Sequence, residues 1–234
     1  MGVFPHFNTL SDSRRTRIVP YEAIVFDFDL TLADSRPGFD ECHRYAAERT
    51  GLPQPSAEAT GRTIGTPLPI AFIDLYGAAE ADKAEEYVKL YQARADDVMT
   101  GLTSMLPGAA DALEALQDAG LRLAIVSQKL RFRVEDVLRR EGLLGRFVTI
   151  LGGEDVPAFK PDPRGILMAL ERLEATQSEA IYVGDTTIDA EAARNAGVGF
   201  VGLLSGFAQR DDFAEYKPLA VLSDVGELPE YLGA

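Results

Sequence analysis

Four separated segments of the chain carry side chains whose types suit phosphoryl transfer. They are Asp27-Phe28-Asp29-Leu30-Thr31, Ser127, Lys160 and Gly184-Asp185-Thr186-Thr187-Ile188-Asp189. Three of them directly follow short apolar runs, over residues 23–26, 123–126 and 180–183, which predict buried parallel strands. Open α/β sheets bind their ligands at the carboxyl ends of such strands. The four segments therefore predict one shared site.

Asp27 and Asp29 lie where the first predicted strand passes into a loop, which can aim both carboxylates at one ligand. Asp27 is placed to attack phosphorus and form an aspartyl-phosphate, which divides one difficult transfer into two easier steps. Asp29 would protonate the leaving oxygen and then deprotonate the water that attacks the intermediate. The structural alternative is a pair of strand-end aspartates that cap a turn, and this short motif alone does not decide between the two.

Ser127 and Lys160 are candidates for holding a phosphoryl group. Ser127 follows the predicted strand 121–126, so its hydroxyl and the next backbone N–H groups can hold a phosphoryl oxygen, although an isolated Ser there is usually a helix N-cap. Lys160 lies between Phe159 and the prolines at 161 and 163, which restrict the backbone and could fix the lysine stem. A fixed ammonium would offset charge that develops in the transition state. The alternative is a solvated loop lysine.

Asp185 and Asp189 are four residues apart at the start of a predicted helix. An oxygen-rich site of this kind suits Mg²⁺, which binds through one or two carboxylates, a backbone carbonyl, waters and substrate phosphate. The alternative is an acidic first helical turn, favoured by the helix dipole. Four structural alternatives in this order and spacing are improbable together, so the sequence favours one functional site.

The composition indicates a folded protein with an excess of negative charge. Of its 234 residues, 46% are hydrophobic and 26% charged, and the formal net charge is −14. This charge argues against nucleic acid and anionic membranes as partners, whereas a small anionic metabolite could bind beside a divalent cation and lysines. Cys42 is the single cysteine, so no intrachain disulfide can form, and no apolar run reaches about 18 residues. We expect a cytoplasmic protein.

Strand and helix patterns alternate along most of the chain. Strands are expected at 21–28, 121–126, 147–151, 180–183, 198–203 and 219–222, and helices at 107–120, 132–140, 163–173, 188–196 and 225–232. Alternation of this kind implies right-handed crossovers and a mainly parallel sheet with helices on both faces. The predicted fold class is α/β, with a Rossmann-like, mainly parallel sheet as its core.

A helical stretch interrupts this alternation. Between Pro37 and about residue 100, amphipathic segments recur near 38–50, 67–76 and 79–99. We therefore divide the chain into an N-terminal extension (1–20), a catalytic core (21–35 and 101–234) and an inserted α-helical cap (36–100). The extension contains a basic segment, 13–17, that we interpret as solvated and assign no function.

These motifs resemble those of the haloacid dehalogenase superfamily, and the resemblance covers nearly all of the chain after residue 20. It implies that Asp27 is the nucleophile and Asp29 the general acid and base. It also implies that Ser127, Gln128 and Lys160 bind the phosphate. The insertion directly after the first motif is similar to the subgroup with an α-helical cap, whose closure excludes water and selects the substrate.

The resemblance also implies how Mg²⁺ would be held. The metal site would combine Asp27, the backbone carbonyl of Asp29, Asp185 and, through water, Asp189, while Thr31 would shape the first loop. Haloacid dehalogenases and phosphonate hydrolases lack an aspartate at the position of Asp29. Its presence therefore implies phosphate esters or anhydrides as substrates.

Residues 60–68 are similar to the cap loop of phosphoglycolate phosphatase-like and pyrophosphatase-like members. This similarity makes Arg62, Thr63 and Thr66 candidate substrate contacts, with a plain surface role as the alternative for Arg62. The implied activity is hydrolysis of a small phosphomonoester, such as phosphoglycolate or a sugar phosphate, by a monomer or homodimer. Inorganic pyrophosphatase, β-phosphoglucomutase-like phosphotransferase and a non-catalytic phosphometabolite sensor are the alternatives.

The chain departs from the family pattern at several positions. Mutase members carry a histidine where this chain has Phe39 and an arginine where it has Ile64, which disfavours mutase activity. His43, four residues after Phe39, is expected to be a half-buried helix residue. Leu30 stands where the family usually has Gly, and Gln128 where Asn is common. We expect activity to survive both changes, with a shift in phosphate affinity or substrate range.

Overall fold

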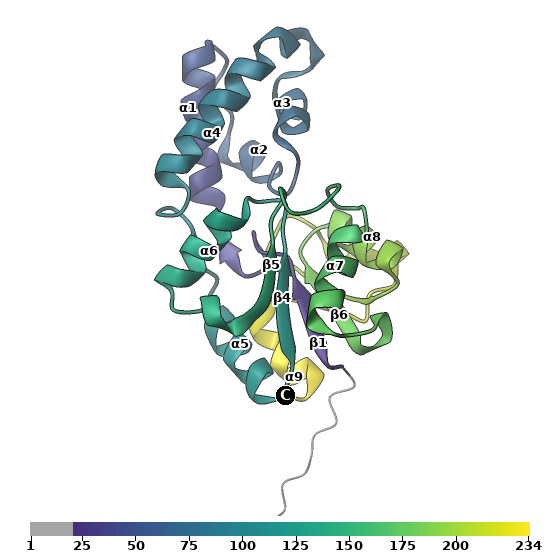
Figure 1. The fold of residues 1–234 in the computed structure, drawn as a ribbon. Helices are drawn as coiled ribbons and strands as arrows, with labels where there is room; N and C mark the ends of the chain where they lie inside the picture. Colours follow the sequence, from purple (N-terminus) through teal and green to yellow (C-terminus); the bar gives the residue numbers. More distant parts are fainter. Residues whose placement is uncertain (1–20) are drawn as a thin grey trace, which may run out of the picture.

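The computed structural model describes residues 21–234. The predicted N-terminal extension and its basic segment lie outside the described residues. Within the described part, the chain forms two parts: a core of strands and helices, and a helical unit above it (Figure 1).

A parallel sheet forms the centre of the core. Six strands pair in the order β5-β4-β1-β6-β7-β8, and every pairing is parallel. The strands are β1 (Ala23–Phe26), β4 (Arg122–Val126), β5 (Phe147–Leu151), β6 (Ala180–Gly184), β7 (Gly199–Leu203) and β8 (Ala220–Leu222). Phe26 at the end of β1 is in register with Ile125 on one side and Val183 on the other. The three strands that precede predicted motifs are therefore adjacent, and the predicted α/β fold class is confirmed.

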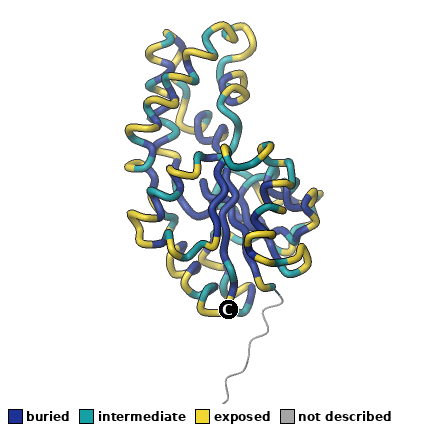
Figure 2. The backbone as a smooth tube through the Cα atoms, in the orientation of Figure 1, coloured by how far each residue is buried: buried dark blue, intermediate teal, exposed yellow. Residues whose placement is uncertain are grey.

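Helices cover both faces of the sheet. They are α5 (Ala109–Asp118), α6 (Arg131–Arg140), α7 (Arg164–Leu173), α8 (Thr187–Ala196) and α9 (Leu228–Leu232), with short 3-10 helices η2 (Leu144–Arg146), η3 (Gln177–Glu179), η4 (Arg210–Tyr216) and η5 (Val225–Glu227). Alternate residues of β1 enter different cores: Ile24 and Phe26 pack with α5, α6 and α9, whereas Ala23 and Val25 pack with α7 and α8. The strands are buried on both sides, as their continuous apolar runs predict (Figure 2).

The helical unit lies between two short strands, β2 (Ala33–Asp34) and β3 (Ser104–Met105), which pair antiparallel. It consists of α1 (Arg36–Thr50), α2 (Ala57–Gly61), α3 (Leu68–Tyr76), the 3-10 helix η1 (Ala78–Lys83) and α4 (Ala84–Val98). The sequence pattern missed α2, because five residues are too few to show helical periodicity; Ser56 caps it by accepting the Ala59 N–H. It also predicted one helix where the structure has η1 followed by α4.

The helical unit has an apolar core of its own, built from α1, α3 and α4. Cys42, Phe72, Tyr87, Tyr91 and Met99 are among its buried members. Burial raises the pKa of the Cys42 thiol to about 12, so this cysteine is an inert core residue. The expectation of a half-buried His43 is wrong, because α1 and α4 enclose its side chain completely.

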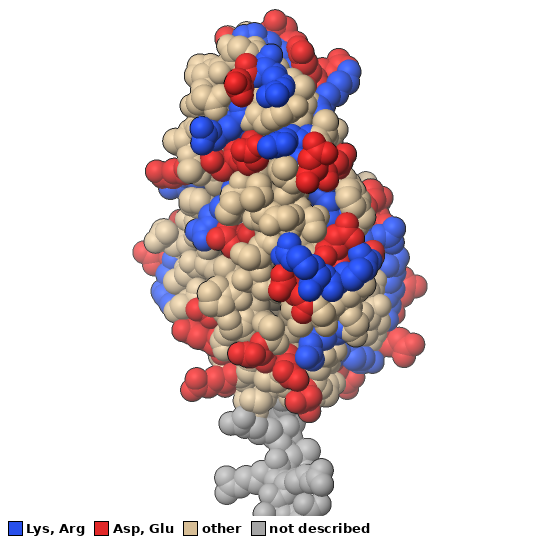
Figure 3. All heavy atoms as spheres, turned by 90° about the vertical axis from the view of Figure 1, so that its left-hand side faces the viewer, with Lys and Arg blue, Asp and Glu red and all other residues tan. Residues whose placement is uncertain are grey.

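The surface carries charges of both signs. On the face shown in Figure 3, acidic and basic side chains are interspersed over the helical unit and the core.

Among residues 21–234, the helices are all too short or too polar to cross a bilayer.

Candidate active site

The loop after β1 holds Asp27 and Asp29 at the carboxyl edge of the sheet. The Asp27 N–H donates to Val183 O at 2.9 Å, which extends the β1–β6 ladder by one residue. The loop then turns back sharply, because Phe28 O accepts hydrogen bonds from the N–H groups of Leu32 and Ala33 at 2.9 and 3.0 Å. Both aspartates are buried.

Three carboxylates converge at this edge. Asp27, Asp185 and Asp189 each offer an oxygen, and these oxygens all lie within 4.8 Å of one another. Burial raises the pKa of Asp27 to about 7, with Lys160 opposing the shift and Asp189 adding to it. Burial, followed by the neighbouring charges of Asp189 and Asp27, also raises the pKa of Asp185 well above its usual range. Crowded, desolvated carboxylates of this kind favour the binding of a cation.

Lys160 lies between two of these carboxylates. Its Nζ is 2.6 Å from Asp189 Oδ1 and 3.0 Å from Asp27 Oδ1, and its side chain is buried. Burial alone disfavours the ammonium, but Asp189 and Asp27 hold the pKa of Lys160 well above its usual range. Lys160 is therefore a fixed positive charge beside Asp27 and not a solvated loop lysine. Asp27 Oδ1 has this ion-pair contact but accepts no well-aligned hydrogen bond from the described residues.

Asp189 is anchored through both of its oxygens. Its Oδ1 accepts hydrogen bonds from Lys160 and from the Tyr182 hydroxyl at 3.2 Å. Its Oδ2 accepts from the N–H and the hydroxyl of Thr186 at 3.1 and 2.5 Å, and the Asp189 N–H donates back to Thr186 Oγ1 to form a capping box. Asp185 has a single such partner in the described part of the chain, the Thr31 hydroxyl at 3.1 Å. Asp185 is thus freer than Asp189 to bind a ligand.

The loop after β7 completes the site beside Asp185. The Ser205 hydroxyl donates to Leu30 O at 2.5 Å, which ties this loop to the one that carries Asp27. A Cβ atom on Gly206 would overlap the Asp185 carboxylate, so only glycine allows this close approach. Ser205 and Gly206 were not among the residues predicted from the sequence. Their signal was a Ser-Gly pair placed, like the other motifs, directly after a parallel strand.

Asp29 faces a different partner. Its Oδ1 lies 2.7 Å from Lys129 Nζ, and both side chains are buried. The Lys129 ammonium also lies 5.0 Å from the centre of the Phe39 ring. The Asp29 carboxylate therefore stays outside the group of three, which leaves its backbone carbonyl as the atom predicted to bind metal. Lys129 was missed, although its position two residues after Ser127 was a usable signal.

Ser127 and Gln128 lie where the sequence placed them, at the end of β4. Ser127 Oγ accepts the Lys129 N–H at 3.2 Å, which leaves the hydroxyl proton to donate elsewhere. The Ser127 N–H itself donates to Leu151 O. The amide oxygen and nitrogen of Gln128 are buried and lack a partner among residues 21–234.

A cavity of about 290 Å³ joins these residues to the helical unit. Asp27, Asp29, Ser127, Lys129 and Lys160 line it from the core. Side chains of the helical unit line the opposite wall, namely Phe39, Thr66, Leu68, Tyr91 and Met99. The carboxylates that could react are therefore buried and face a space lined by both the core and the helical unit.

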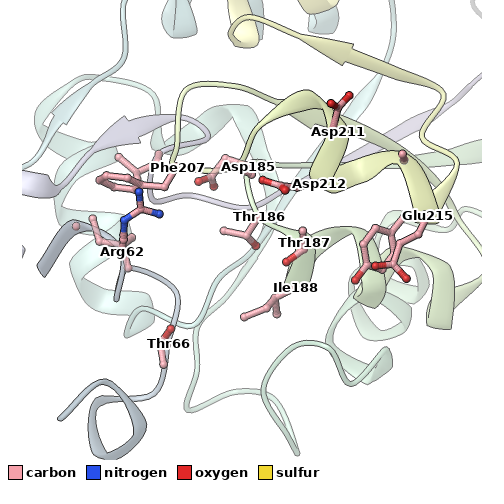
Figure 4. Close-up of a pocket in the computed structure, with 16 residues that line it drawn as sticks. Arg62, Thr66, Asp185, Thr186, Thr187, Ile188, Phe207, Asp211, Asp212 and Glu215 are labelled. Atoms are coloured by element: carbon pink, nitrogen blue, oxygen red, sulfur yellow. The ribbon is translucent and has the colours of Figure 1, made fainter. Parts of the chain in front are cut away.

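A wider groove of about 750 Å³ has Asp185 as part of its lining (Figure 4). Arg62 lies in it with its guanidinium carbon 5.5 Å from the centre of the Phe207 ring, and it pairs with Glu58 at 3.1 Å. Thr66 lines both the groove and the cavity. Thr63 is buried instead: its hydroxyl donates to Thr60 O at 2.7 Å and lies 3.1 Å from His43 Nε2. Of the three candidate substrate contacts, Arg62 and Thr66 face open space and Thr63 does not.

The residues present fit a hard divalent cation. The donors are carboxylate oxygens, which this hard cation prefers. Asp27 Oδ1 accepts no well-aligned hydrogen bond from the described residues, and burial raises the pKa values of Asp27 and Asp185, so a cation bound here would stabilise their charged forms. Asp27 and Asp185 are the direct candidates, and Asp189 supports them.

Comparisons with known proteins agree with this geometry. Residues 24–203 match the family model described as haloacid dehalogenase-like hydrolase. A phosphoglycolate phosphatase from Cereibacter sphaeroides is 33% identical over 79% of this chain and 85% of its own length. The pyrophosphatase PpaX from Bacillus velezensis is 30% identical over 90% of this chain and 96% of its own.

Solved structures lead to the same family. The crystal structure of a haloacid dehalogenase-like hydrolase from Bacteroides fragilis superposes with a TM-score of 0.84 at 39% identity, and covers 89% of this chain and 99% of that one. The sheet order, the carboxylates at its carboxyl edge and these similarities have one common explanation. The chain belongs to the haloacid dehalogenase-like hydrolase family.

Proposed function

We propose that this chain is a Mg²⁺-dependent phosphatase that hydrolyses a small phosphomonoester through an aspartyl-phosphate on Asp27. The observation that carries this proposal is the meeting of Asp27, Asp185 and Lys160 at one buried point. Asp29 follows on the same loop and faces the same cavity as Asp27. The relative named phosphoglycolate phosphatase supports a phosphomonoester as substrate.

In the first step, a carboxylate oxygen of Asp27 attacks phosphorus and the ester bond to the leaving oxygen breaks. Asp29, in its protonated form, donates the proton that the leaving oxygen needs, and Lys129, 2.7 Å from Asp29 Oδ1, then stabilises the carboxylate that remains for the second step. Lys160 lies 3.0 Å from Asp27 and stabilises the charge that accumulates on the phosphoryl oxygens, to which the Ser127 hydroxyl donates. The products of this step are a free alcohol and the aspartyl-phosphate.

In the second step, Asp29 takes a proton from a water molecule, and that water attacks the phosphorus of the aspartyl-phosphate. The bond from Asp27 to phosphorus breaks, and inorganic phosphate leaves with Asp27 regenerated. Bound at Asp27, Asp185 and the Asp29 carbonyl, with Asp189 in support, Mg²⁺ would supply positive charge that offsets the repulsion between the carboxylates and the phosphate. One loop thus presents both the nucleophile and the acid to the same cavity.

The helical unit is suited to act as the predicted cap over residues 36–100. It roofs the cavity with apolar side chains, including Phe39, Leu68 and Met99. Excluding water in this way strengthens the electrostatic interactions at Asp27 and protects the aspartyl-phosphate from premature hydrolysis. The antiparallel pair of β2 and β3 forms both connections between the cap and the core, which makes it the hinge of this proposal.

Inorganic pyrophosphatase is the second candidate, and the similarity to PpaX favours it. The cavity argues the other way, because pyrophosphate has no carbon frame to pack against Phe39, Leu68 and Met99. Mutase activity is disfavoured, because this chain has Phe39 at the position where mutase members of the family carry a histidine in the cap. A sensor would need neither Asp27 nor Asp29 as reacting groups.

Phosphate release tests the proposal. The purified chain is incubated with phosphoglycolate, sugar phosphates, nucleoside monophosphates and pyrophosphate, with Mg²⁺ or with excess chelator. We expect metal-dependent release from one or a few phosphomonoesters. Release from pyrophosphate alone would establish the second candidate, and no release from any compound by folded protein would overturn the phosphatase assignment.

A further inference from the structure

Buried polar atoms without partners concentrate at the cavity between core and helical unit. Within the described residues, such side-chain atoms belong to Asp27, Ser35, Tyr91, Gln128 and Arg133, and all of these except Ser35 line this cavity. Buried polar groups are nearly always hydrogen-bonded, so a cluster of exceptions requires an explanation. A bound ligand that supplies the missing partners explains the four residues that line the cavity.

Arg133 is the most informative member of this cluster. It belongs to α6 of the core, and its side chain is 9% exposed. Its Nη2 reaches across to α4, where it lies 2.5 Å from Asp96 Oδ1 and 3.5 Å from Gln92 O. Its Nε is buried without a partner among residues 21–234. One edge of the guanidinium thus ties core to helical unit, and a second donor is left for the cavity.

The charge of Arg133 is not cancelled inside the cavity. The side chain of Asp96 is 60% exposed, so water screens it, whereas Lys129 is paired with the equally buried Asp29. Beside Arg133, the cavity offers the Tyr91 hydroxyl and the Gln128 amide as further hydrogen-bonding groups. This part of the wall suits an electron-rich oxygen.

The rest of the wall is apolar. Phe39, Leu68, Val88 and Met99 line the same cavity from the helical unit. Its volume of about 290 Å³ equals that of about ten water molecules, enough for a phosphate and a small organic group. A ligand that fills it must combine a compact carbon frame with an oxygen that accepts hydrogen bonds.

We propose that Arg133, with Tyr91, forms the subsite for the leaving group and selects phosphomonoesters whose leaving group carries a hydrogen-bond-accepting oxygen. This inference rests on the proposed function and names its substrate class. The Arg133 Nε–H donates to that oxygen while the carbon frame packs against Phe39 and Leu68. Arg133, a residue of the core, therefore binds the leaving group. Because Arg133 also contacts Asp96 of α4, the position of α4 affects this binding.

The test compares ligands that differ in this oxygen. Binding of 2-phosphoglycolate, a triose phosphate and phenyl phosphate is measured by calorimetry with Mg²⁺ in the Asp27→Asn background, where turnover does not interfere. Phenyl phosphate has a leaving group of similar size, without an oxygen other than the ester oxygen. Arg133→Met is then added to remove the donors while keeping an unbranched side chain.

We expect Arg133→Met to weaken binding of the preferred oxygen-bearing ligand about ten- to a hundredfold, because hydrogen bonds to charged groups contribute that much. Binding of phenyl phosphate should change less than about threefold, as expected when no hydrogen bond is lost. Arg139→Met removes an exposed arginine of the same helix and should change neither. The melting temperature of each variant verifies that it is folded.

Equal weakening of all three ligands, no weakening of any, or no binding of the oxygen-bearing ligands in the Asp27→Asn background would overturn the inference. Turnover by the unmodified chain decides the proposed function separately. A chain that binds these ligands selectively through Arg133 but releases no phosphate would contradict the phosphatase assignment alone.

Discussion

The core edge and the helical unit both bury polar side chains, but in different ways. At the core edge, three carboxylates each place an oxygen within 4.8 Å of the other two, and the ammonium of Lys160 contacts two of these carboxylates. In the helical unit, His43 is enclosed by Tyr87, Tyr91 and Thr63, and no charged side chain bonds to its ring in the part of the chain that is described. The first arrangement concentrates charge, and the second avoids it.

The hydrogen bonds around His43 define which of its nitrogens carries the proton. The Thr63 hydroxyl donates to Thr60 O, so it accepts from His43 Nε2–H at 3.1 Å. His43 Nδ1 in turn accepts from the Tyr87 hydroxyl at 2.8 Å. Both nitrogens of the neutral ring are thus satisfied, and burial lowers the pKa of His43 to about 4. This network fixes the turn at Thr63, which leads directly into Ile64 and Thr66 on the cavity and groove walls.

Burial pushes both regions toward their neutral forms, since it raises the pKa of Asp27 and lowers that of His43. The two regions differ in how their buried ionisable groups are satisfied. The core edge retains ionisable groups that a cation and a phosphate can satisfy, as a reactive site requires. The network around His43 in the helical unit is satisfied by its own neighbours and stays neutral.

Asp27→Asn should have the largest effect. It removes the attacking oxygen while keeping the shape of the side chain, so we expect phosphate release to fall at least about a thousandfold. The melting temperature should stay equal or rise, because the substitution removes one of three crowded, buried acids. Steady-state kinetics and thermal melts measure both. Asp118→Asn, at an exposed position of α5, is the control and should change neither. Retained turnover in Asp27→Asn would remove the catalytic half of the contrast.

Asp185→Asn should sharpen the contrast by separating metal binding from folding. We expect the Mg²⁺ concentration for half-maximal activity to rise at least about tenfold. Even substitution of a residue that only hydrogen-bonds to a metal ligand often lowers metal affinity by that factor. In chelator the variant should be as stable as the unmodified chain or more so, because one buried acid with a raised pKa is gone. The rise in melting temperature caused by Mg²⁺ should shrink. An unchanged Mg²⁺ requirement would contradict the assignment of Asp185 to the metal site.

His43→Gln tests the neutral region through pH. The unfolded chain binds a proton at His43 near pH 6.5, whereas the folded chain does so near pH 4. The unfolded state therefore holds more protons in that window, and the contribution to stability is present above pH 6.5 and lost as the pH falls. We expect the unmodified chain to lose about 2 kcal/mol more than the variant between pH 7 and 5. Denaturant unfolding at both pH values measures this.

Gln is a suitable replacement for His43, because its amide can accept from Tyr87 and donate to Thr63 without titrating. Equal pH slopes in the two proteins would show that His43 is not held neutral. In that case the buried His43 would carry a positive charge in the helical unit.

The sequence predicted the core edge far better than the helical unit, and the reason is geometric. A parallel strand that ends in a functional residue places that residue at a known edge, so Asp27, Ser127 and Asp185 could be brought together from strand patterns alone. Lys160 needed only the spacing of its motif. The chirality of crossovers and the burial of parallel strands leave few other arrangements.

Contacts between elements could not be predicted in the same way. Lys129 pairs with Asp29, a residue 100 positions earlier, and Arg133 meets Asp96 across two helices. The first pair depends on how two loops of the core fold over the sheet edge, and the second on how the helical unit sits on the core, and periodicity encodes neither. Thr63 was expected to face substrate. Its hydroxyl instead contacts His43, because α1 packs against the 60–66 turn, and the sequence pattern does not show this packing.

Leu30 should give the smallest effect, and it tests whether the core edge stores backbone strain. Leu30 has φ 57° and is buried, so its left-handed backbone costs about 1 kcal/mol while burial of its side chain contributes about 2 kcal/mol. Leu30→Gly loses the burial but relieves the strain. Leu30→Ala loses most of the burial and keeps the strain.

We therefore expect Leu30→Ala to be less stable than Leu30→Gly by about 1 kcal/mol in denaturant unfolding, although alanine is the larger residue. Activity should persist in both variants, because the Leu30 carbonyl still accepts from Ser205 and the carboxylates keep their loop. If alanine proves the more stable of the two, the nucleophile loop is unstrained at Leu30. The core edge would then differ from the helical unit in its charge alone, and not also in its backbone.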